Sequence, residues 1–119
     1  KHFKINKSIY NQLFVKNFLS TSSVTIKKKL IINANYFDEK LTNAQDYDLW
    51  LKIGDNFSLY FLSEYLGTYY ERNDNITSTP YKKKIKNLLK ILKKNKGNVN
   101  KLFYYYKFFR LVVNKEWFK

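Results

Sequence analysis

The side chain best placed to do chemistry in this sequence is the carboxylate of Asp46, within the stretch 44–53. Leu49, Trp50 and Ile53 follow it at helical spacing, so the stretch predicts a helix with one apolar face. Because Asp46 precedes Trp50 by one helical turn, its carboxylate is expected at the rim of that buried face. Such a carboxylate can act as a general base, or it can simply stabilise the start of the helix. The residues alone leave both interpretations open.

The helix that positions Asp46 has start and stop signals of its own. Thr42 or Asn43 is a suitable N-cap, and Thr42 with Gln45 forms a T-x-x-Q capping box. Gly54 is expected to end the helix. Asp48 lies a short way along from Asp46 and is expected to face outward.

The residues before this helix predict three shorter elements. Apolar residues at helical spacing favour a helix within 1–16, and 28–33 reads as a second short helix. The stretch 18–26 alternates apolar and hydroxyl residues, which is typical of a strand with its apolar side chains in the core. Its hydroxyl residues 20–23 could contact a ligand, although a cluster of this kind is more often structural.

The residues after it predict strands and then helices. Apolar runs within 57–70 indicate two short strands with a bend near Ser63 and Glu64. An amphipathic pattern predicts a helix over 82–94, and Asn100 is expected to cap a further, largely aromatic helix that runs to about Val113.

Four segments resemble motifs of family 2 glycosyltransferases, in the order that the family has them. Residues 44–53 are similar to the family's "ED" motif, E-D-Y-D-L-W-L-R-[LI]. Upstream, 22–29 resembles the "ss-v-x-[IF]-[KR]-[KR]" segment and 35–39 resembles G-G-F-D-E. Downstream, 66–77 is similar to L-x-x-Y-R-x-H-x-x-N-I-S. The match extends over about 18–78, and four motifs in order are more specific than any one of them.

The resemblance implies an α/β fold in the whole protein, of the GT-A (nucleotide-diphospho-sugar transferase) type. This chain would be its C-terminal, acceptor-side portion, helix-rich with a few short strands, in a bacterial enzyme that makes cell-surface polysaccharide. The reaction would be inverting transfer from a nucleotide-sugar donor to a glycan or lipid-linked acceptor, with Asp46 as the base. The family's D-x-D motif, which binds Mg²⁺ or Mn²⁺, belongs to an upstream half that this sequence does not contain. The chain alone is therefore expected to be inactive.

The resemblance also implies substrate contacts at Gln45, Trp50 and Arg72. Gln45 replaces the Glu of the "ED" pair, and Arg72 stands where the family has His. Trp50 could instead be a core residue, and Arg72 could form an ion pair with a neighbouring acid. The triplet 46–48 has the D-x-D spelling but the wrong place, so no metal site is expected in this chain.

One loop departs from the family pattern. Asn35-Tyr36 replaces the Gly-Gly pair that precedes Phe-Asp-Glu. Asn tolerates a left-handed backbone, but Tyr does so poorly, so this loop is expected to differ.

The charge of the chain divides it at about residue 80. Of the formal net charge of +14, residues 1–80 carry 10 basic and 8 acidic side chains, whereas 81–119 carry 13 basic and 1 acidic. We therefore predict a catalytic part over 1–80 and a basic, aromatic, helical tail over 81–119. In the tail helix, Lys107, Arg110 and Asn114 form one narrow polar stripe, so the rest of that helix needs to be covered by protein or lipid.

The basic tail leaves two other classes of protein open. It could dock on an anionic membrane, which would place the protein in the cytoplasm or peripherally on the inner face of the plasma membrane. It could also be a nucleic-acid-binding module, although it has no zinc-ligand spacing and no known recognition motif, so nucleic acid is not expected as a partner. The sequence has no cysteine and no apolar run long enough to cross a bilayer.

Overall fold

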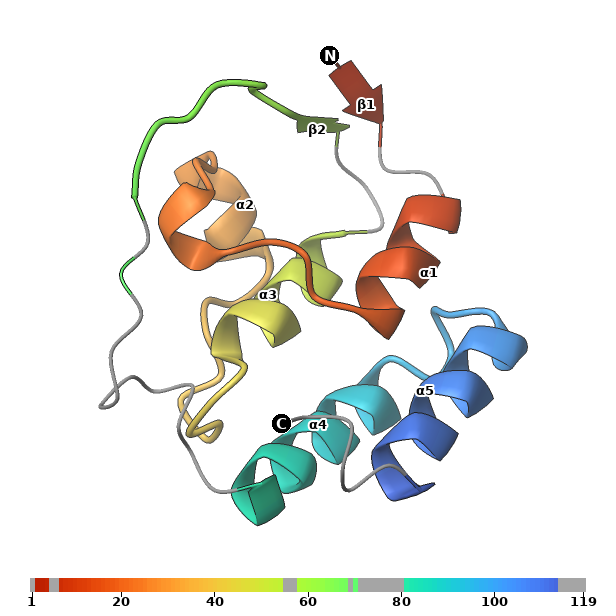
Figure 1. Cartoon of the computed structure of the whole chain (residues 1–119). Helices are drawn as coiled ribbons and strands as arrows, with labels where there is room; N and C mark the ends of the chain where they lie inside the picture. The colour runs from red at the N-terminus through yellow and green to blue at the C-terminus, as the bar shows by residue number, and fades with distance from the viewer. Residues whose placement is uncertain (1, 5–6, 55–57, 69, 71–80, 114–119) are drawn as a thin grey trace.

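The computed structural model describes residues 2–4, 7–54, 58–68, 70 and 81–113 (Figure 1). These residues form mostly helices, joined by irregular loops. Their bounds are α1 Lys7–Val15, α2 Lys28–Asn33, α3 Gln45–Ile53, α4 Tyr81–Lys94 and α5 Lys101–Val113, with strands β1 His2–Lys4 and β2 Ser58–Tyr60. The prediction of a helix-rich chain with a few short strands is confirmed. Helices α2, α4 and α5 lie within about a residue of their expected bounds, and α1 lies inside the range 1–16 in which a helix was predicted.

The two strands pair with each other as a small antiparallel sheet. His2 lies opposite Tyr60, and Lys4 lies opposite Ser58. The first strand predicted within 57–70 is therefore present as β2, and the predicted bend is found at Glu64. The second predicted strand is absent from the described residues between 61 and 70.

The strand predicted over 18–26 is wrong. In its place the chain runs irregularly and forms a single 3₁₀ turn, Thr21–Ser23. Ser23 is the cause, because both its backbone N–H and its hydroxyl donate to the carbonyl of Ser20, the hydroxyl at 2.9 Å. Local hydroxyl bonds of this kind compete with strand pairing. Leu19, Val24 and Ile26 still pack against the core, half-buried, as predicted, whereas Phe18 is exposed.

Helix α2 ends in the loop that the sequence marked as unusual. The N–H of Tyr36 bonds to the carbonyl of Ile31, and that of Asn35 bonds to the carbonyl of Ile32, which is a Schellman ending. Both Asn35 and Tyr36 have φ of 57°. Tyr36 therefore adopts the left-handed conformation that the sequence argues it tolerates poorly, at a cost of about 1 kcal/mol.

One hydrophobic core joins four helices and lies between α1, α3, α4 and α5 (Figure 1). Helix α1 packs against both α3 and α5, and α4 packs against α5. The core consists of the following buried side chains: Tyr10, Leu13, Phe14, Leu41, Tyr47, Leu49, Trp50, Leu51, Ile53, Ile91, Leu92, Val99 and Leu111. The predicted domain boundary at residue 80 lies outside the described residues and stays a prediction, but helices from both sides of it contribute to this core.

Helix α5 has a lysine at a core-facing position, where an apolar residue is the usual choice. Lys107, from the predicted polar stripe, is only 8% exposed, and its ammonium donates to the carbonyl of Val15 at 2.6 Å. The same ammonium lies 5.5 Å from the centre of the Tyr47 ring. Burial, and secondarily the charge of Arg110, lowers the pKa of Lys107 to about 8. A lysine of α5 thus faces the core, next to the helix that carries Asp46.

We expect the free energy of unfolding to increase as the pH rises from 8 toward 10. In this pH range Lys107 stays protonated in the unfolded chain, where its pKa has the ordinary value. In the folded chain its pKa is about 8, so Lys107 loses its proton there. The gain should be about 1–3 kcal/mol, given 1.4 kcal/mol per unit of pKa difference. Above pH 10 the trend should reverse, because burial raises the pKa of Tyr47 well above its ordinary value, and only the unfolded chain then loses that proton.

Urea unfolding at pH 7, 8, 9 and 10 measures this. Lys107→Met should remove the rise, while Lys101→Met, at an exposed position on the same helix, should keep it. A wild-type profile that is flat over this range, or an unchanged rise in Lys107→Met, would contradict the assignment.

Candidate active site at the start of helix α3

Helix α3 begins one or two residues later than the capping signals predict. Its N-cap is Ala44, which has φ of 58° and no side-chain cap, so the prediction of Thr42 or Asn43 is wrong. The amide of Gln45 donates to the carbonyl of Leu41 at 2.8 Å instead of completing a capping box. A left-handed alanine costs about 1–2 kcal/mol and persists only where the surroundings hold it. The strain lies two residues before Asp46.

The surroundings that hold this loop come from α4. The side-chain amide of Asn87 is buried and lies 3.1 Å from Thr42 Oγ1 and 2.9 Å from Asn43 Oδ1. The two predicted capping side chains are therefore engaged with α4 and not with their own helix. A helix of the basic tail thus fixes the start of α3.

The end of α3 is Gly54, as predicted. A Cβ at this position would lie 2.8 Å from the Trp50 carbonyl oxygen and 3.2 Å from Cδ2 of Tyr10. Backbone and ring leave no room there, so only glycine allows α1 and α3 to approach this closely.

The carboxylate of Asp46 is half-buried and held by two donors. The Thr21 hydroxyl donates to Oδ2 at 2.9 Å, and the backbone N–H of Tyr47 donates to Oδ1 at 2.7 Å. Thr21 belongs to the 3₁₀ turn, so two segments distant in sequence meet at this carboxylate. The predicted position of Asp46 at the rim of the buried face is confirmed.

Asp46 lines a pocket of about 490 Å³, and this volume lies within the range of small-ligand sites. Its walls come from the 3₁₀ turn, the loop after α2, the start of α3 and one side of α4. The lining residues are Thr21, Phe37, Asn43, Ala44, Gln45, Asp46, Lys84 and Leu88. The pocket therefore combines one carboxylate, one ammonium and neutral hydrogen-bonding groups beside an aromatic ring.

The other predicted substrate contacts have different outcomes. Gln45 lines the pocket with Asp46. Trp50 is 6% exposed in the core, and it is not among the residues that line this pocket. Its indole N–H is buried without a hydrogen-bond partner among the described residues. Arg72 lies outside the described residues, so its role, like that of Trp50 as a sugar contact, stays a prediction.

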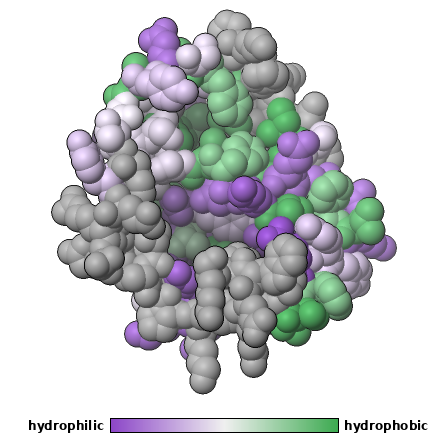
Figure 2. All heavy atoms as spheres, viewed as in Figure 1, coloured by the Kyte–Doolittle hydropathy of each residue, from purple (hydrophilic) through white to green (hydrophobic). Residues whose placement is uncertain are grey.

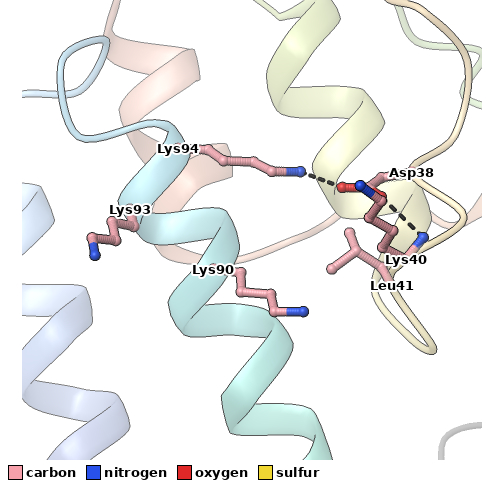
Figure 3. Close-up of a pocket in the computed structure, with 6 residues that line it drawn as sticks. All are labelled: Asp38, Lys40, Leu41, Lys90, Lys93 and Lys94. Carbon is pink, nitrogen blue, oxygen red and sulfur yellow. Dashed lines mark hydrogen bonds and ion pairs between the residues drawn. The ribbon is translucent and has the colours of Figure 1, made fainter.

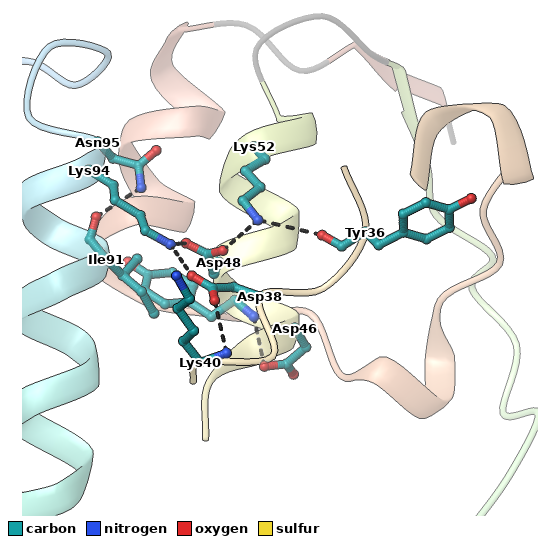
Figure 4. A network of polar contacts seen from close by, with 10 residues as sticks. Tyr36, Asp38, Lys40, Asp46, Asp48, Lys52, Ile91, Lys94 and Asn95 are labelled. Carbon is teal, nitrogen blue, oxygen red and sulfur yellow. Dashed lines mark hydrogen bonds and ion pairs between the residues drawn. The ribbon is translucent and has the colours of Figure 1, made fainter. Parts of the chain in front are cut away.

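Asp48 does not face outward as predicted but is 0% exposed. Its carboxylate lies between two ammonium groups, 2.8 Å from Lys52 and 3.3 Å from Lys94 (Figure 4). Lys94 also pairs with Asp38, and this hydrogen bond lowers the pKa of Asp38. Burial alone would lower the pKa of Lys94, but its bonds to the two carboxylates raise it. Asp48 is therefore a structural link between α3 and α4.

A second pocket, of about 460 Å³, lies on the other side of this ion pair. Lys90 and Lys94 extend from α4 toward the loop after α2 (Figure 3). The lining residues are Asp38, Lys40, Leu41, Lys90, Lys93 and Lys94. Its lining is cationic, and its one carboxylate, that of Asp38, is paired with Lys94.

The triplet 46–48 does not fit a divalent cation. Asp46 bonds to a hydroxyl and a backbone N–H, while Asp48 is held by two lysines, so the two carboxylates do not converge. Within the part of the chain that the structure describes, no three His, Cys, Asp or Glu side chains are grouped for metal binding. The expectation of Mg²⁺ or Mn²⁺ in an upstream half stays a prediction.

Two pocket residues could not be identified from their own sequence context. Thr21 belongs to the hydroxyl cluster whose ligand contact was left open, and nothing in its spacing connects it with Asp46. Lys84 is one of eight lysines between Lys82 and Lys96, and only the packing of α4 distinguishes it.

Comparison with known proteins gives one similarity. The chain is 32% identical over 122 residues to an uncharacterized glycosyltransferase of Methanocaldococcus jannaschii. The matched region covers 95% of this chain and 42% of the relative's length, so the chain spans less than half of that protein. No known family description matches the chain, and no solved structure does.

Proposed function

We propose that this chain is the acceptor-side part of an inverting, family 2 glycosyltransferase with a GT-A fold. The observation that carries the proposal is the carboxylate of Asp46, half-buried at a pocket and held by Thr21 and by the start of α3. The similarity to a glycosyltransferase over 95% of the chain supports the same class. The order of the four motifs supports the finer assignment to family 2.

In the proposed reaction Asp46 is the general base. A hydroxyl of the glycan or lipid-linked acceptor enters the pocket and transfers its proton to the carboxylate as its oxygen attacks the anomeric carbon of the donor. The new carbon–oxygen bond forms on the face opposite the leaving group. The bond between the anomeric carbon and the phosphate oxygen breaks, and its electron pair leaves with the nucleoside diphosphate.

The other pocket residues bind and orient. Thr21 fixes the orientation of the Asp46 carboxylate through its hydrogen bond to Oδ2, and the amide of Gln45 is anchored to the backbone at Leu41. Lys84 adds a positive charge to the lining of the same pocket, which favours an acceptor that carries an anionic group. Arg72 and Trp50 are the further substrate contacts that the motif resemblance implies. A divalent cation held by the upstream half would stabilise the charge of the departing diphosphate.

The test compares the 119-residue chain with a longer protein that contains both halves of the proposed enzyme. Isothermal titration of the 119-residue chain with UDP and Mn²⁺ should show no specific binding, because the phosphate and metal sites belong to the upstream half. A longer protein that contains both halves should release nucleoside diphosphate from one of a panel of nucleotide sugars, and only when an acceptor is present.

The control is the same panel with the 119-residue chain, which should release nothing. A micromolar dissociation constant for UDP on the chain alone would contradict the division into halves. Absence of release by the two-half protein, with any donor and with both glycan and lipid-linked acceptors, would contradict the transferase assignment.

A further inference from the structure

Helix α5 presents a continuous apolar stripe to the outside of the molecule. Its members recur at i, i+3, i+4, i+7, i+10 and i+11, which places them along one helix face. Each is between 51% and 75% exposed, and none is charged; they are Leu102, Tyr105, Tyr106, Phe109, Val112 and Val113. We call these six residues the outward stripe. Figure 2 shows hydrophobic side chains at the surface on the side where α5 lies in Figure 1.

The stripe is not the face that α5 uses for folding. The core-facing side of the helix is Lys107 with Leu111, both buried. A helix that only needed to complete the core would place its lysine outside and its Phe and Leu residues inside. Here Lys107 is buried, although burial of its charge is costly, and the six residues of the outward stripe stay exposed. Leu111 is buried as well, and Phe103 and Tyr104 of the same helix pack against the core. The outward stripe is therefore available for a partner, as large exposed apolar patches usually are.

Positive charges border the stripe. Lys101 is exposed at the first turn of α5, and the Arg110 guanidinium stacks 5.7 Å from the centre of the Tyr106 ring, at the edge of the stripe. The neighbouring helix α4 exposes four more lysines, Lys83, Lys86, Lys90 and Lys93. Over residues 81–119 the chain has 13 basic side chains and 1 acidic. The partner should therefore be apolar at its centre and anionic at its edge.

We infer that α5 lies in the interface of an anionic lipid membrane. The outward stripe enters the boundary between headgroups and acyl chains, where the tyrosine hydroxyls meet the headgroups. Lys101 and Arg110 lie at the level of the lipid phosphates. Among the described residues, no helix is long and apolar enough to cross a bilayer. The inference goes beyond the proposed function and does not depend on it.

The observations favour lipid over two other occupants. A second copy of the chain would bring two sets of these cations together around the same stripe, which costs energy through repulsion. Nucleic acid would use the aromatic rings for stacking, but half of the stripe is aliphatic, and leucine and valine offer no stacking face.

The test is co-sedimentation of the 119-residue chain with vesicles of phosphatidylcholine that contain phosphatidylglycerol as about one lipid in three. Leu102→Gln/Tyr105→Gln removes two stripe residues but keeps helix-forming side chains. It should weaken binding about 10- to 100-fold, because two apolar side chains no longer enter the membrane interface. Binding should also be strong at low salt and weak near 0.5 M salt, as surface-charge attraction is screened.

The matched control is Leu66→Gln/Tyr65→Gln, which changes the same two residue types at exposed positions of the loop after β2. It should bind as the wild type does. Both double variants should keep the wild-type thermal midpoint, because all four side chains are exposed. Truncation at Pro80 is not a useful variant, since it removes the core residues Ile91 and Leu111.

Several results would overturn the inference. These are equal binding by the stripe variant and the wild type, equal binding to vesicles without phosphatidylglycerol, or tighter binding to DNA than to vesicles at matched salt. A dimer in sedimentation velocity that the stripe variant dissociates would assign the stripe to a second copy instead. Asp46→Asn should bind vesicles normally, so failure of the proposed catalytic role and failure of membrane binding can be distinguished.

Discussion

Replacement of Asp46 by Asn in the proposed two-half transferase should lower kcat for sugar transfer by about 10²–10⁴. Asn matches Asp in size and still suits the first turn of a helix. Its one oxygen can accept from the Tyr47 N–H, and its amide NH2 can donate to the Thr21 hydroxyl, which then accepts instead of donating. The fold should therefore persist while the basic carboxylate is lost. The measurement is kcat beside the thermal midpoint of the same variant.

Two further variants serve as comparisons for Asp46→Asn. Thr21→Val removes only the hydroxyl that positions Oδ2, so its loss of kcat should be smaller than that of Asp46→Asn, with little change in KM. Glu64→Gln removes an exposed carboxylate away from the pocket and should be silent. If Asp46→Asn retains more than about a tenth of wild-type kcat, Asp46 is a helix-start acid and not the base.

The burial of Asp48 changes which control is useful. A sequence argument offers Asp48→Asn as the neutral counterpart of Asp46→Asn, because both acids stand in the first turn of the same helix. In the structure Asp48 is an ion-paired link to α4, so its substitution tests stability instead. Helical spacing alone could not show that Asp48 is paired with α4, because Lys94 belongs to a helix far away in the sequence.

The helices were predictable because their signals are local. Apolar residues at helical spacing, Asn100 as a cap and Gly54 as a stop are each read within a few residues, and the structure has them all. The start of α3 was not predictable in the same way. Ala44 adopts a left-handed conformation because the side chain of Asn87, far away in the sequence, holds the two residues before it. Non-local contacts override capping preference here.

The candidate site likewise has residues that local sequence signals identify and residues that only the folded structure reveals. Asp46 and Gln45 could be identified from the motif around them, and the structure places both at one pocket. Thr21 could not, because a stretch that alternates apolar and hydroxyl residues predicts a strand, and the 3₁₀ turn that presents Thr21 depends on the hydroxyl of Ser23. Which face of α5 packs against the core could not be predicted either. Its composition allows an aromatic face inside, and only the contact of Lys107 with Val15 shows that the lysine faces the core.

The largest effect on stability is expected where α3 and α4 are joined by charge. The double variant Lys52→Met/Lys94→Met leaves the carboxylate of Asp48 fully buried with neither of its cations. An uncompensated buried charge should lower the free energy of unfolding by about 3–5 kcal/mol. That is a large part of the about 5–15 kcal/mol typical of a domain, so urea unfolding at pH 7 should show a clear shift of the midpoint.

The control and the rescue separate charge from packing. Lys90→Met/Lys93→Met makes the same chemical change at two exposed positions of α4 and should alter stability by no more than about 1 kcal/mol. Addition of Asp48→Asn to the damaging double variant should restore at least about half of the loss, because the charge that lacked a partner is gone. If the two lysine pairs give equal losses, or if Asp48→Asn restores nothing, then α3 and α4 are held by their apolar contacts and the ion pairs contribute little.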